Sequence, residues 1–403
     1  MEKLLLIGID TRSMLNSALK LNYDIYSASY FSTSDTPTIK NQKIILKESD
    51  GESCGMFEYK FDSASMMEMS KDYIDEADYI IPVSGISPED FSKKDQKKIL
   101  GNHDAGNVED KLKFYKKIKD EFLTPMTFHV SDIDEVREIN KNHQDIQFIL
   151  KPVQGSGGYD VNLLNNDMNI DLNDNKFIMQ EYIKGINLSS SVLSTKKEAK
   201  SIITSRLLTM NDFGYENDFR YVGNILPLTD KSIMTKVNDI DEINNELENT
   251  SERLIRKFNL IGSNGVDYIL SEDKLYVIEV NPRIQGTFEC VEKTLGINML
   301  EAHIKSCHGE IIEIPEAECY TYKKIIYSPA RMKYSPMKLD NIYDLPHTGS
   351  ITEKDEPLLT IIDKSDDFEK LYEKVELTSK IVNRESKLNL PDRKEVGDSQ
   401  ILT

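Results

Sequence analysis

Acidic and amide side chains punctuate one short apolar stretch of the chain. Tyr276 to Val280 is rich in strand-forming residues and ends just before Pro282, which predicts a β-strand. Because side chains alternate along a strand, Val277, Glu279 and Asn281 are expected on one face. A carboxylate and an amide two positions apart offer hard oxygen ligands for a metal ion.

A second predicted strand, Val266 to Leu270, precedes the first and is separated from it by a turn. In such a hairpin Asp267 lies near Glu279. The oxygens of Asp267, Glu279 and Asn281 suit Mg²⁺, with Mn²⁺ as an alternative. The other interpretation is a strand pair with solvated acids. Glu279 interrupts an apolar run, where an acid is costly unless it is paired or bound to a metal, and this favours the metal site.

A glycine-rich loop, Gln154 to Gly158, lies between two predicted strands, Phe148 to Pro152 and Val161 to Leu164. With Lys151 just upstream, its backbone N–H groups could cover phosphates. It is not a Walker A loop, because no Gly-Lys-Ser/Thr follows and no helix opens there. A plain flexible hairpin fits the same residues.

The composition limits the class of protein. The chain of 403 residues is long enough for two or three domains, and its net charge of −19 argues against nucleic acid or an anionic membrane as the main partner. The four cysteines are scattered, as in a reducing cytoplasm. A strand is predicted almost from Met1, and no apolar run approaches membrane-spanning length, so we expect a cytoplasmic protein without a signal peptide.

The first part of the chain predicts an α/β fold. Lys3 to Ile9 is a continuous apolar run typical of a buried parallel strand, with further strands at Asp24 to Ala28 and Ala77 to Val83 and a helix at Ser13 to Leu21. Strands alternating with helices favour a doubly wound parallel sheet. The turn after the first strand lacks G-x-G-x-x-G, so no dinucleotide site is predicted.

The later part predicts mixed α and β structure. Helices are expected over the ranges Asp110 to Phe122, Asp241 to Phe258, Glu289 to His303 and Phe368 to Val382. Strands are expected over the ranges Lys176 to Ile183, Ser189 to Ser194, Ser201 to Thr204, Tyr322 to Ile326 and Leu358 to Ile362. From Glu385 onward the chain is charged and polar and is predicted to be a frayed tail.

Several motifs in a fixed order resemble the ATP-grasp superfamily. They are Asp110-Lys111, Leu150-Lys-Pro152, the loop 154–158, Gln180-Glu-Tyr-Ile183, Gly265-Val-Asp267 and Glu279-Val-Asn-Pro-Arg283. Each motif is weak alone, but their order is specific, and the resemblance covers roughly residues 1 to 308. It implies a pre-ATP-grasp domain over 1–103 and an ATP-grasp domain of two α+β subdomains over 104–308, with the lid at about 112–180. A C-terminal α+β segment would follow over 309–385, and a polar tail over 386–403.

The resemblance implies a role for each matching residue. Lys111 and Lys151 would contact ATP phosphates, and Arg283 would meet the transferred phosphate or the substrate carboxylate. Asp267, Glu279 and Asn281 would bind Mg²⁺. The loop residues would cover the triphosphate: Gln154, Gly155, Ser156, Gly157 and Gly158.

The adenine and ribose contacts depart in part from the family pattern. Glu181, with the backbone of Tyr182 and Ile183, would bind adenine. The family usually carries Gly-x-Glu after this hinge, with the glutamate on the ribose, whereas here Asn187 takes that place. An amide binds a hydroxyl less strongly than a carboxylate does.

Within the superfamily, two groups share additional motifs with the chain. Leu100-Gly-Asn102, Asp344 to Gly349 and Glu356 to Thr360 resemble archaeal and methylotroph ATP-grasp carboligases related to biotin carboxylase. Phe219 to Asn224 and the serine-rich strand are similar to tyramine–glutamate ligase, which is shorter.

The implied activity is that of an ADP-forming carboxylate–amine ligase. ATP would phosphorylate a small carboxylate to an acyl phosphate, which an amine then attacks. The alternatives are a carboxylase like biotin carboxylase, although the chain has no Met-Lys-Met motif, and a nucleotide-binding regulatory subunit without turnover. Partners would be small-molecule substrates and a second copy of the chain in a homodimer, with no nucleic acid or membrane.

Three arginines are candidates for binding the acceptor carboxylate: Arg206, Arg220 and Arg283. An ordinary surface position is the alternative for the first two. His303 and His308 flank Cys307, but a helix-end histidine with satisfied hydrogen bonds is favoured over a nucleophilic Cys–His pair.

Overall fold

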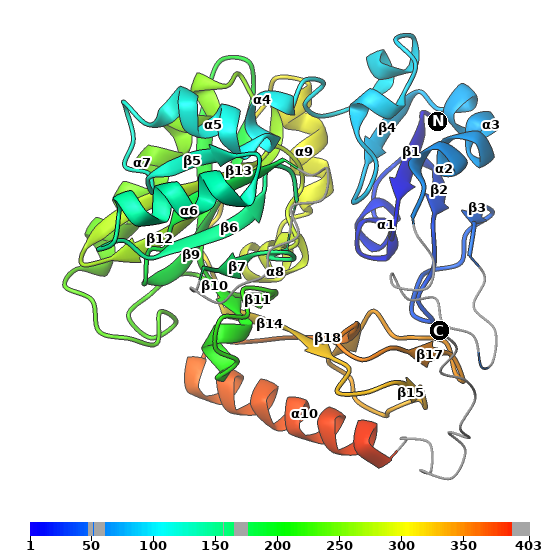
Figure 1. Ribbon diagram of the computed structural model, residues 1–403. Coiled ribbons are helices and arrows are strands. Elements are labelled where there is room, and N and C mark those ends of the chain that lie inside the picture. The colour runs from blue at the N-terminus through cyan, green and yellow to red at the C-terminus, as the bar shows by residue number, and fades with distance from the viewer. Residues whose placement is uncertain (47–50, 52–60, 156, 165–175, 389–403) are drawn as a thin grey trace, which may run out of the picture. The chain divides into compact units, whose positions relative to one another are not determined.

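A computed structural model describes residues 1–46, 51, 61–155, 157–164 and 176–388 (Figure 1). The chain forms two compact units, residues 1–99 together with 322–403, and residues 100–321. Among the helices of the described residues, none has the length and apolar character that a membrane span requires.

The first unit contains the predicted parallel sheet. Its four strands run in the order β3-β2-β1-β4, and every neighbouring pair is parallel. Leu4 to Ile7 of the central strand are fully buried, as expected for a strand covered on both faces. The strands are β1 (Lys3–Gly8), β2 (Asp24–Ser29), β3 (Asn41–Ile44) and β4 (Tyr79–Pro82).

Short helices connect these strands and pack around them. They are α1 (Arg12–Ala18), α2 (Ser63–Met69), α3 (Lys71–Glu76) and the 3₁₀ turns η1 (Pro88–Asp90) and η2 (Asp95–Lys98). Met66 of α2 and Ile74 of α3 lie in the same core cluster as Leu5 and Ile80 of the strands. Alternation of strands and helices therefore produced the predicted architecture.

The C-terminal segment completes the first unit. Its strands are β14 (Tyr320–Tyr327), β15 (Met332–Lys333), β16 (Ile342–Tyr343), β17 (Ile351–Thr352) and β18 (Pro357–Ser365). Helix α10 (Phe368–Leu388) packs along β18 and continues past its predicted end at Val382. Ser386 is fully buried and donates to Val382 O at 2.8 Å, so the prediction that the polar tail begins at Glu385 was wrong.

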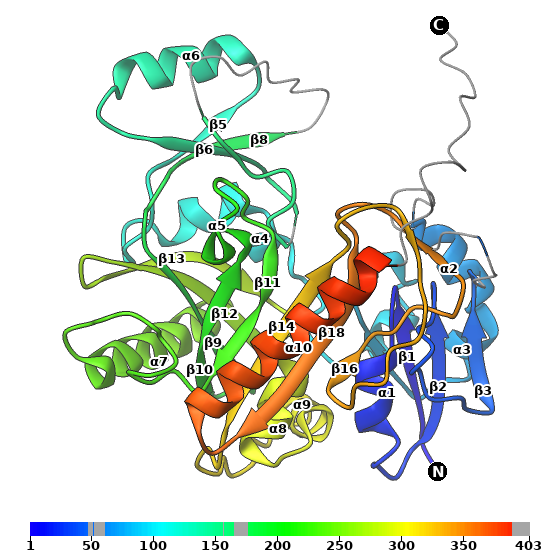
Figure 2. The same ribbon diagram turned by 90° about the horizontal axis from the view of Figure 1, so that it is seen from below.

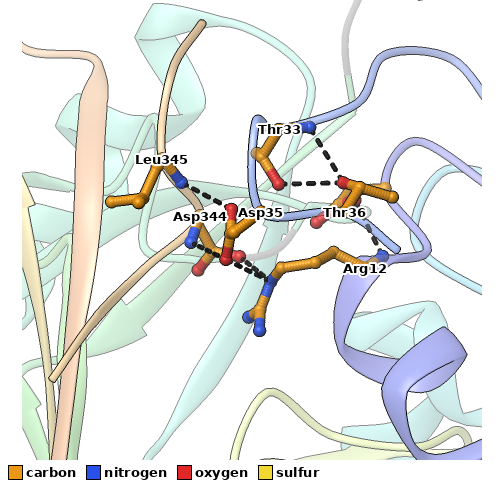
Figure 3. Close-up of polar contacts among 7 residues, drawn as sticks. Arg12, Thr33, Asp35, Thr36, Asp344 and Leu345 are labelled. Carbon is orange, nitrogen blue, oxygen red and sulfur yellow. Dashed lines mark hydrogen bonds and ion pairs between the residues drawn. The ribbon is translucent and has the colours of Figure 1, made fainter. Parts of the chain in front are cut away.

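A buried arginine joins the C-terminal segment to the first sheet (Figure 3). Arg12 is 1% exposed, and its Nε donates to Asp344 Oδ1 at 2.6 Å. Asp35 lies 3.6 Å from the same nitrogen and accepts from the backbone N–H groups of Asp344 and Leu345. A buried charge is tolerated when it is paired in this way. These contacts explain why two segments far apart in the sequence form one unit.

The second unit is built on an antiparallel sheet in which β13, β12, β9, β10 and β11 lie side by side in that order. Helix α7 (Ile240–Lys257) packs on β9 and β10, and its Leu247 and Leu254 share a core with strand residues such as Val266 (Figure 1). The strands are β9 (Ile186–Ser194), β10 (Ala199–Thr209), β11 (Tyr221–Leu226), β12 (Gly262–Ser271) and β13 (Lys274–Asn281).

A smaller antiparallel sheet precedes the large one in the chain, with helix α6 (Ile133–Asn142) lying along it (Figure 2). Its strands, in the order in which they pair, are β5 (Thr127–Val130), β8 (Phe177–Glu181), β6 (Phe148–Pro152) and β7 (Asn162–Leu163). Helices α4 (Gly106–Glu109) and α5 (Lys111–Ile118) come before it, and the turn η3 (Met210–Phe213) follows β10.

The helix predicted over Glu289 to His303 is two helices, α8 (Phe288–Leu295) and α9 (Met299–Cys307). Gly296 adopts φ of 66° and ends α8, and Asn298 caps α9 by accepting from the Glu301 N–H. A left-handed glycine followed by a capping asparagine favours a break over a continuous helix.

Candidate active site

The two acidic side chains of the β12–β13 hairpin come from directly opposite residues. Asp267 is the ladder partner of Glu279, and Gly265 is the partner of Asn281. The Cβ atoms of such partners lie about 5 Å apart. Asn281 Nδ2 also donates to Asp267 Oδ2 at 2.9 Å. The hairpin therefore brings together the three side chains predicted to bind a metal.

These side chains fit a divalent cation. Burial raises the pKa of the Asp267 carboxyl, and the negative charge of Glu279 raises it further. A cation between the carboxylates would offset both effects. Within the described ranges, no group of three or more His, Cys, Asp and Glu side chains suits a metal. A site of two carboxylates and one amide leaves room for water and phosphate oxygens, as Mg²⁺ prefers.

A β-bulge changes the predicted face of one residue. Val277 pairs with Tyr268 while Glu279 pairs with Asp267, so Ile278 is an extra residue without a ladder partner. Val277 consequently lies in the core with Val280, and the prediction that it shares a face with Glu279 was wrong. The bulge shifts the alternation by one residue, which keeps the acidic end of the strand on the opposite face from the core.

Two lysines lie beside the acid pair. Lys111 begins α5, and its Nζ is 3.5 Å from Glu279 Oε2 and donates to Gly155 O at 2.8 Å. Lys151 lies on β6 and is 5% exposed. Its Nζ forms no hydrogen bond or ion pair with another residue of the described ranges. Burial, with a smaller effect from the charge of Lys111, lowers the pKa of Lys151 to about 8.

The glycine-rich loop is fixed on its C-terminal side. Gly157 and Gly158 adopt φ of 70° and 77°, which favour glycine. A Cβ at Gly158 would lie 2.0 Å from Phe219 O, and Tyr221 N donates to Gly157 O at 3.0 Å. Ser156 lies outside the described residues. The backbone N–H groups of Gln154, Gly155, Gly157 and Gly158 donate to no other described residue, so they are available to an anion.

The predicted adenine hinge is held by its own hydrogen bonds. Glu181 Oε2 accepts from Met126 N at 3.0 Å, and Tyr182 N donates to Gln147 O at 2.8 Å. These two groups therefore already have protein partners, which shapes the hinge. The buried Ile183 follows, and its N–H donates to no residue in the described part of the chain. Asn187 lies further along, on β9 opposite Ile269.

The three candidate arginines differ in their surroundings. Arg206 pairs with Asp212 at 2.8 Å, and it stands opposite Leu188, a core residue, so it lies on the face away from Asp267. Arg220 pairs with Asp218, in the segment that contacts Gly158. Arg283 is exposed and forms no ion pair within the described ranges. Only Arg283 combines a free guanidinium with a place next to the metal-binding strand.

His303 and Cys307 have structural surroundings. His303 Nδ1 accepts from Ser263 N at 2.9 Å, and its Nε2 lies 3.1 Å from Leu100 O. Burial lowers the pKa of His303 to about 4 and raises the pKa of Cys307 to about 12. The histidine is thus neutral and the thiol protonated, so the interpretation of a histidine with satisfied hydrogen bonds holds.

Two polar residues in the site were missed from the sequence. Ser189 donates to Asp267 Oδ1 at 2.6 Å, and Gln285 Nε2 donates to Ser189 Oγ at 3.3 Å. The run Ser189-Ser-Ser191 was a visible signal, because serine is uncommon inside a buried strand. Its partner could be found only from the pairing of β9 with β12.

Comparison with known proteins supports the resemblance seen in the motifs. Residues 108–287 match the family described as the ATP-grasp domain. The chain therefore contains an ATP-grasp domain, and the site described above lies within or just before its matched residues.

Two relatives from Methanocaldococcus jannaschii align with the chain. One is an uncharacterized protein, 28% identical over 375 residues that cover 90% of this chain and 88% of that protein. The other is tyramine–L-glutamate ligase, 27% identical over 222 residues that cover 55% of this chain and 56% of the ligase. The match to the ligase thus spans just over half of each protein.

Solved structures share the fold at low identity. N5-carboxyaminoimidazole ribonucleotide synthetase from Thermotoga maritima superposes with a TM-score of 0.68 at 14% identity, covering 94% of this chain and 98% of that one. Biotin carboxylase from Campylobacter jejuni gives 0.69 at 14% identity, covering 93% and 89%. At these identities the similarity establishes the fold alone.

Proposed function

We propose that the protein is an ADP-forming ligase that phosphorylates a small carboxylate with ATP and joins it to an amine. The observation that carries this proposal is the arrangement of Lys111 and the buried Lys151 beside the acid pair Asp267 and Glu279. A buried ammonium without a protein partner is costly, and a phosphate would supply its counter-charge.

The chain's own residues supply binding and charge. Lys111, Lys151 and the N–H groups of the loop 154–158 would bind the phosphates. Asp267, Glu279 and Asn281 would bind Mg²⁺, which neutralises charge on the phosphate oxygens when it is present. Tyr182 and Ile183 would line the adenine site, with Glu181 holding the hinge in shape and Asn187 on the ribose. Arg283 would orient the acceptor carboxylate.

The reaction balances in two steps. A carboxylate oxygen attacks the γ-phosphorus of ATP, the bond from that phosphorus to the β-phosphate oxygen breaks, and ADP leaves. The amine nitrogen then attacks the acyl carbon, phosphate leaves with the oxygen of the C–O–P linkage, and the nitrogen loses a proton. Positioning and charge neutralisation are the protein's contribution, which is why no nucleophilic side chain is needed.

The test is a screen of ADP release over pairs of carboxylates and amines, with Mg²⁺ present. L-Glutamate and tyramine form the first pair, because a relative is named for them. We expect ADP release that requires both partners and a product whose mass equals their sum less water. Release with bicarbonate and a carboxylated product would indicate a carboxylase instead. ATP binding without turnover in any pair would favour the regulatory alternative.

A further inference from the structure

We propose that Ser189 and Gln285 position the metal-binding carboxylate of Asp267, and that Gly265 is a glycine because Gln285 occupies the space of its side chain. This inference rests on the proposed function, in which Asp267 and Glu279 bind Mg²⁺.

The first step is the contact between Ser189 and Asp267. The two residues are partners in the ladder between β9 and β12, and Ser189 is 1% exposed. Its Oγ donates to Asp267 Oδ1 at 2.6 Å, while Asn281 Nδ2 donates to Oδ2 at 2.9 Å. With one donor on each oxygen, the plane of the carboxylate is fixed and each oxygen keeps a lone pair for a cation.

The second step is the direction of the serine hydrogen bond. A hydroxyl has one hydrogen to donate, and it can point to several acceptors. Gln285 Nε2 donates to Ser189 Oγ at 3.3 Å, so the serine hydrogen is left for Asp267. Ser191 Oγ in turn donates to Gln285 Oε1 at 3.2 Å, which orients the amide. The chain of donors therefore runs from Ser191 through Gln285 and Ser189 to Asp267.

The third step is the space at Gly265. Its φ is not in the left-handed region, so its conformation does not demand glycine. A Cβ there would lie 1.7 Å from Gln285 Cδ, far inside any real contact. Gly265 stands two residues before Asp267, on the same face of β12. Any side chain at this position would push Gln285 away from Ser189.

The test measures metal binding directly. Mn²⁺ is titrated into each variant, and free Mn²⁺ is followed by electron paramagnetic resonance, so no turnover is needed. Glu279→Gln is measured first and should abolish the site. If Mn²⁺ binding is unchanged in Glu279→Gln, the metal site of the proposed function is wrong, and this inference falls with it.

The positioning residues are then tested with matched variants. Ser189→Ala should weaken Mn²⁺ binding about 10- to 100-fold, as loss of a hydrogen bond to a metal-binding side chain commonly does, and Ser189→Thr should retain it. Ser190→Ala is the control, because Ser190 is equally buried and bonds Ser201 instead. Wild-type affinity in Ser189→Ala, beside a loss in Glu279→Gln, would overturn the inference while leaving the proposed function intact.

A double-mutant cycle tests the role of Gly265 and does not depend on the serine variants folding. Gln285→Ala and Gly265→Ala should each weaken Mn²⁺ binding. Because both act by removing the same amide, Gly265→Ala should have no additional effect in the Gln285→Ala background, where the shortened side chain leaves room for the methyl group. Equal effects of Gly265→Ala in both backgrounds would contradict the proposed role of Gly265.

Discussion

Asp267 and Glu279 face one another across the β12–β13 ladder, and Lys111 reaches only Glu279, at 3.5 Å. The pair thus has one close protein cation for two carboxylates, which is the electrostatic situation of a metal site before its ion binds. The second lysine, Lys151, lies near enough for its pKa to respond to Glu279.

Neutralising one acid should separate folding from function. In Glu279→Gln the repulsion from Asp267 is removed, so we expect a folded protein whose Mg²⁺-dependent ADP release falls about 100-fold or more. The measurement is ADP release against Mg²⁺ concentration, with Glu272→Gln as the control because Glu272 is an exposed acid in the turn of the same hairpin. Turnover equal to wild type at saturating Mg²⁺ would show that Glu279 is not a metal ligand.

The glycine-rich loop should respond to nucleotide. The backbone N–H groups of Gln154, Gly155, Gly157 and Gly158 donate to no described residue, so they should exchange hydrogen quickly in the free protein. Binding of a non-hydrolysable ATP analogue should slow this exchange if the loop covers the phosphates. The N–H of Val153, which donates to Lys176 O at 2.9 Å, serves as an internal reference. Unchanged exchange in the loop at saturating analogue would count against its role.

Arg283 should contribute to ligation more than to ATP binding. Arg283→Lys keeps the charge but loses the two parallel hydrogen bonds that a guanidinium offers a carboxylate. We expect ligation to fall about 100-fold through misplacement of the acceptor, with ATP affinity mostly retained. Both quantities are measured on the one variant. Equal losses would assign Arg283 to the ATP site, and Arg206→Lys, on the opposite face of the sheet, should leave ATP affinity and the KM for the carboxylate unchanged.

Lys151 should cost the free protein stability. The pKa of Lys151 falls from 10.5 to about 8, so at pH 7 the charged form is penalised by about 3 kcal/mol at most. The unfolded chain binds more protons between pH 8 and 10.5, so stability should rise with pH across that window. Lys151→Met, which keeps the apolar stem, should therefore raise the urea midpoint at pH 7 and remove this rise.

The same variant should lose ATP affinity, because the ammonium that the phosphates would pair with is gone. Lys111→Met is the contrasting variant, since Lys111 is paired with Glu279 and donates to Gly155 O. It should lower the urea midpoint or leave it unchanged. A midpoint for Lys151→Met below that of the wild type at pH 7 would contradict the assignment of Lys151 as a buried, unpaired cation.

Features set by local sequence were predicted well. The turn between Leu270 and Lys274 forces the two strands together, so Asp267 and Glu279 could be paired without knowledge of the rest of the fold. The buried parallel strand Lys3–Gly8 was equally visible, because an unbroken apolar run has few alternatives in a globular protein.

Features set by pairing or by competing local signals were not. Nothing in the run from Tyr276 to Val280 marks Ile278 as the bulge, because its position depends on the partner strand. Helix α6 was missed although Asp132 caps it by accepting from the next residues' N–H groups, a signal that apolar periodicity alone does not weigh. Ser189 and Gln285 meet only after β9 and β12 have paired.

The bulge also divides β13 into two parts that would tolerate a change in chain length differently. Loss of the codon for Ile278 would leave Glu279 opposite Asp267 and Val277 opposite Tyr268, because the unpaired residue has no ladder partner to give up. Loss of Val280 would instead slide Asn281 by one position and turn its amide toward the core. A single-codon deletion is therefore neutral for the chemistry on one side of Glu279 and destructive on the other.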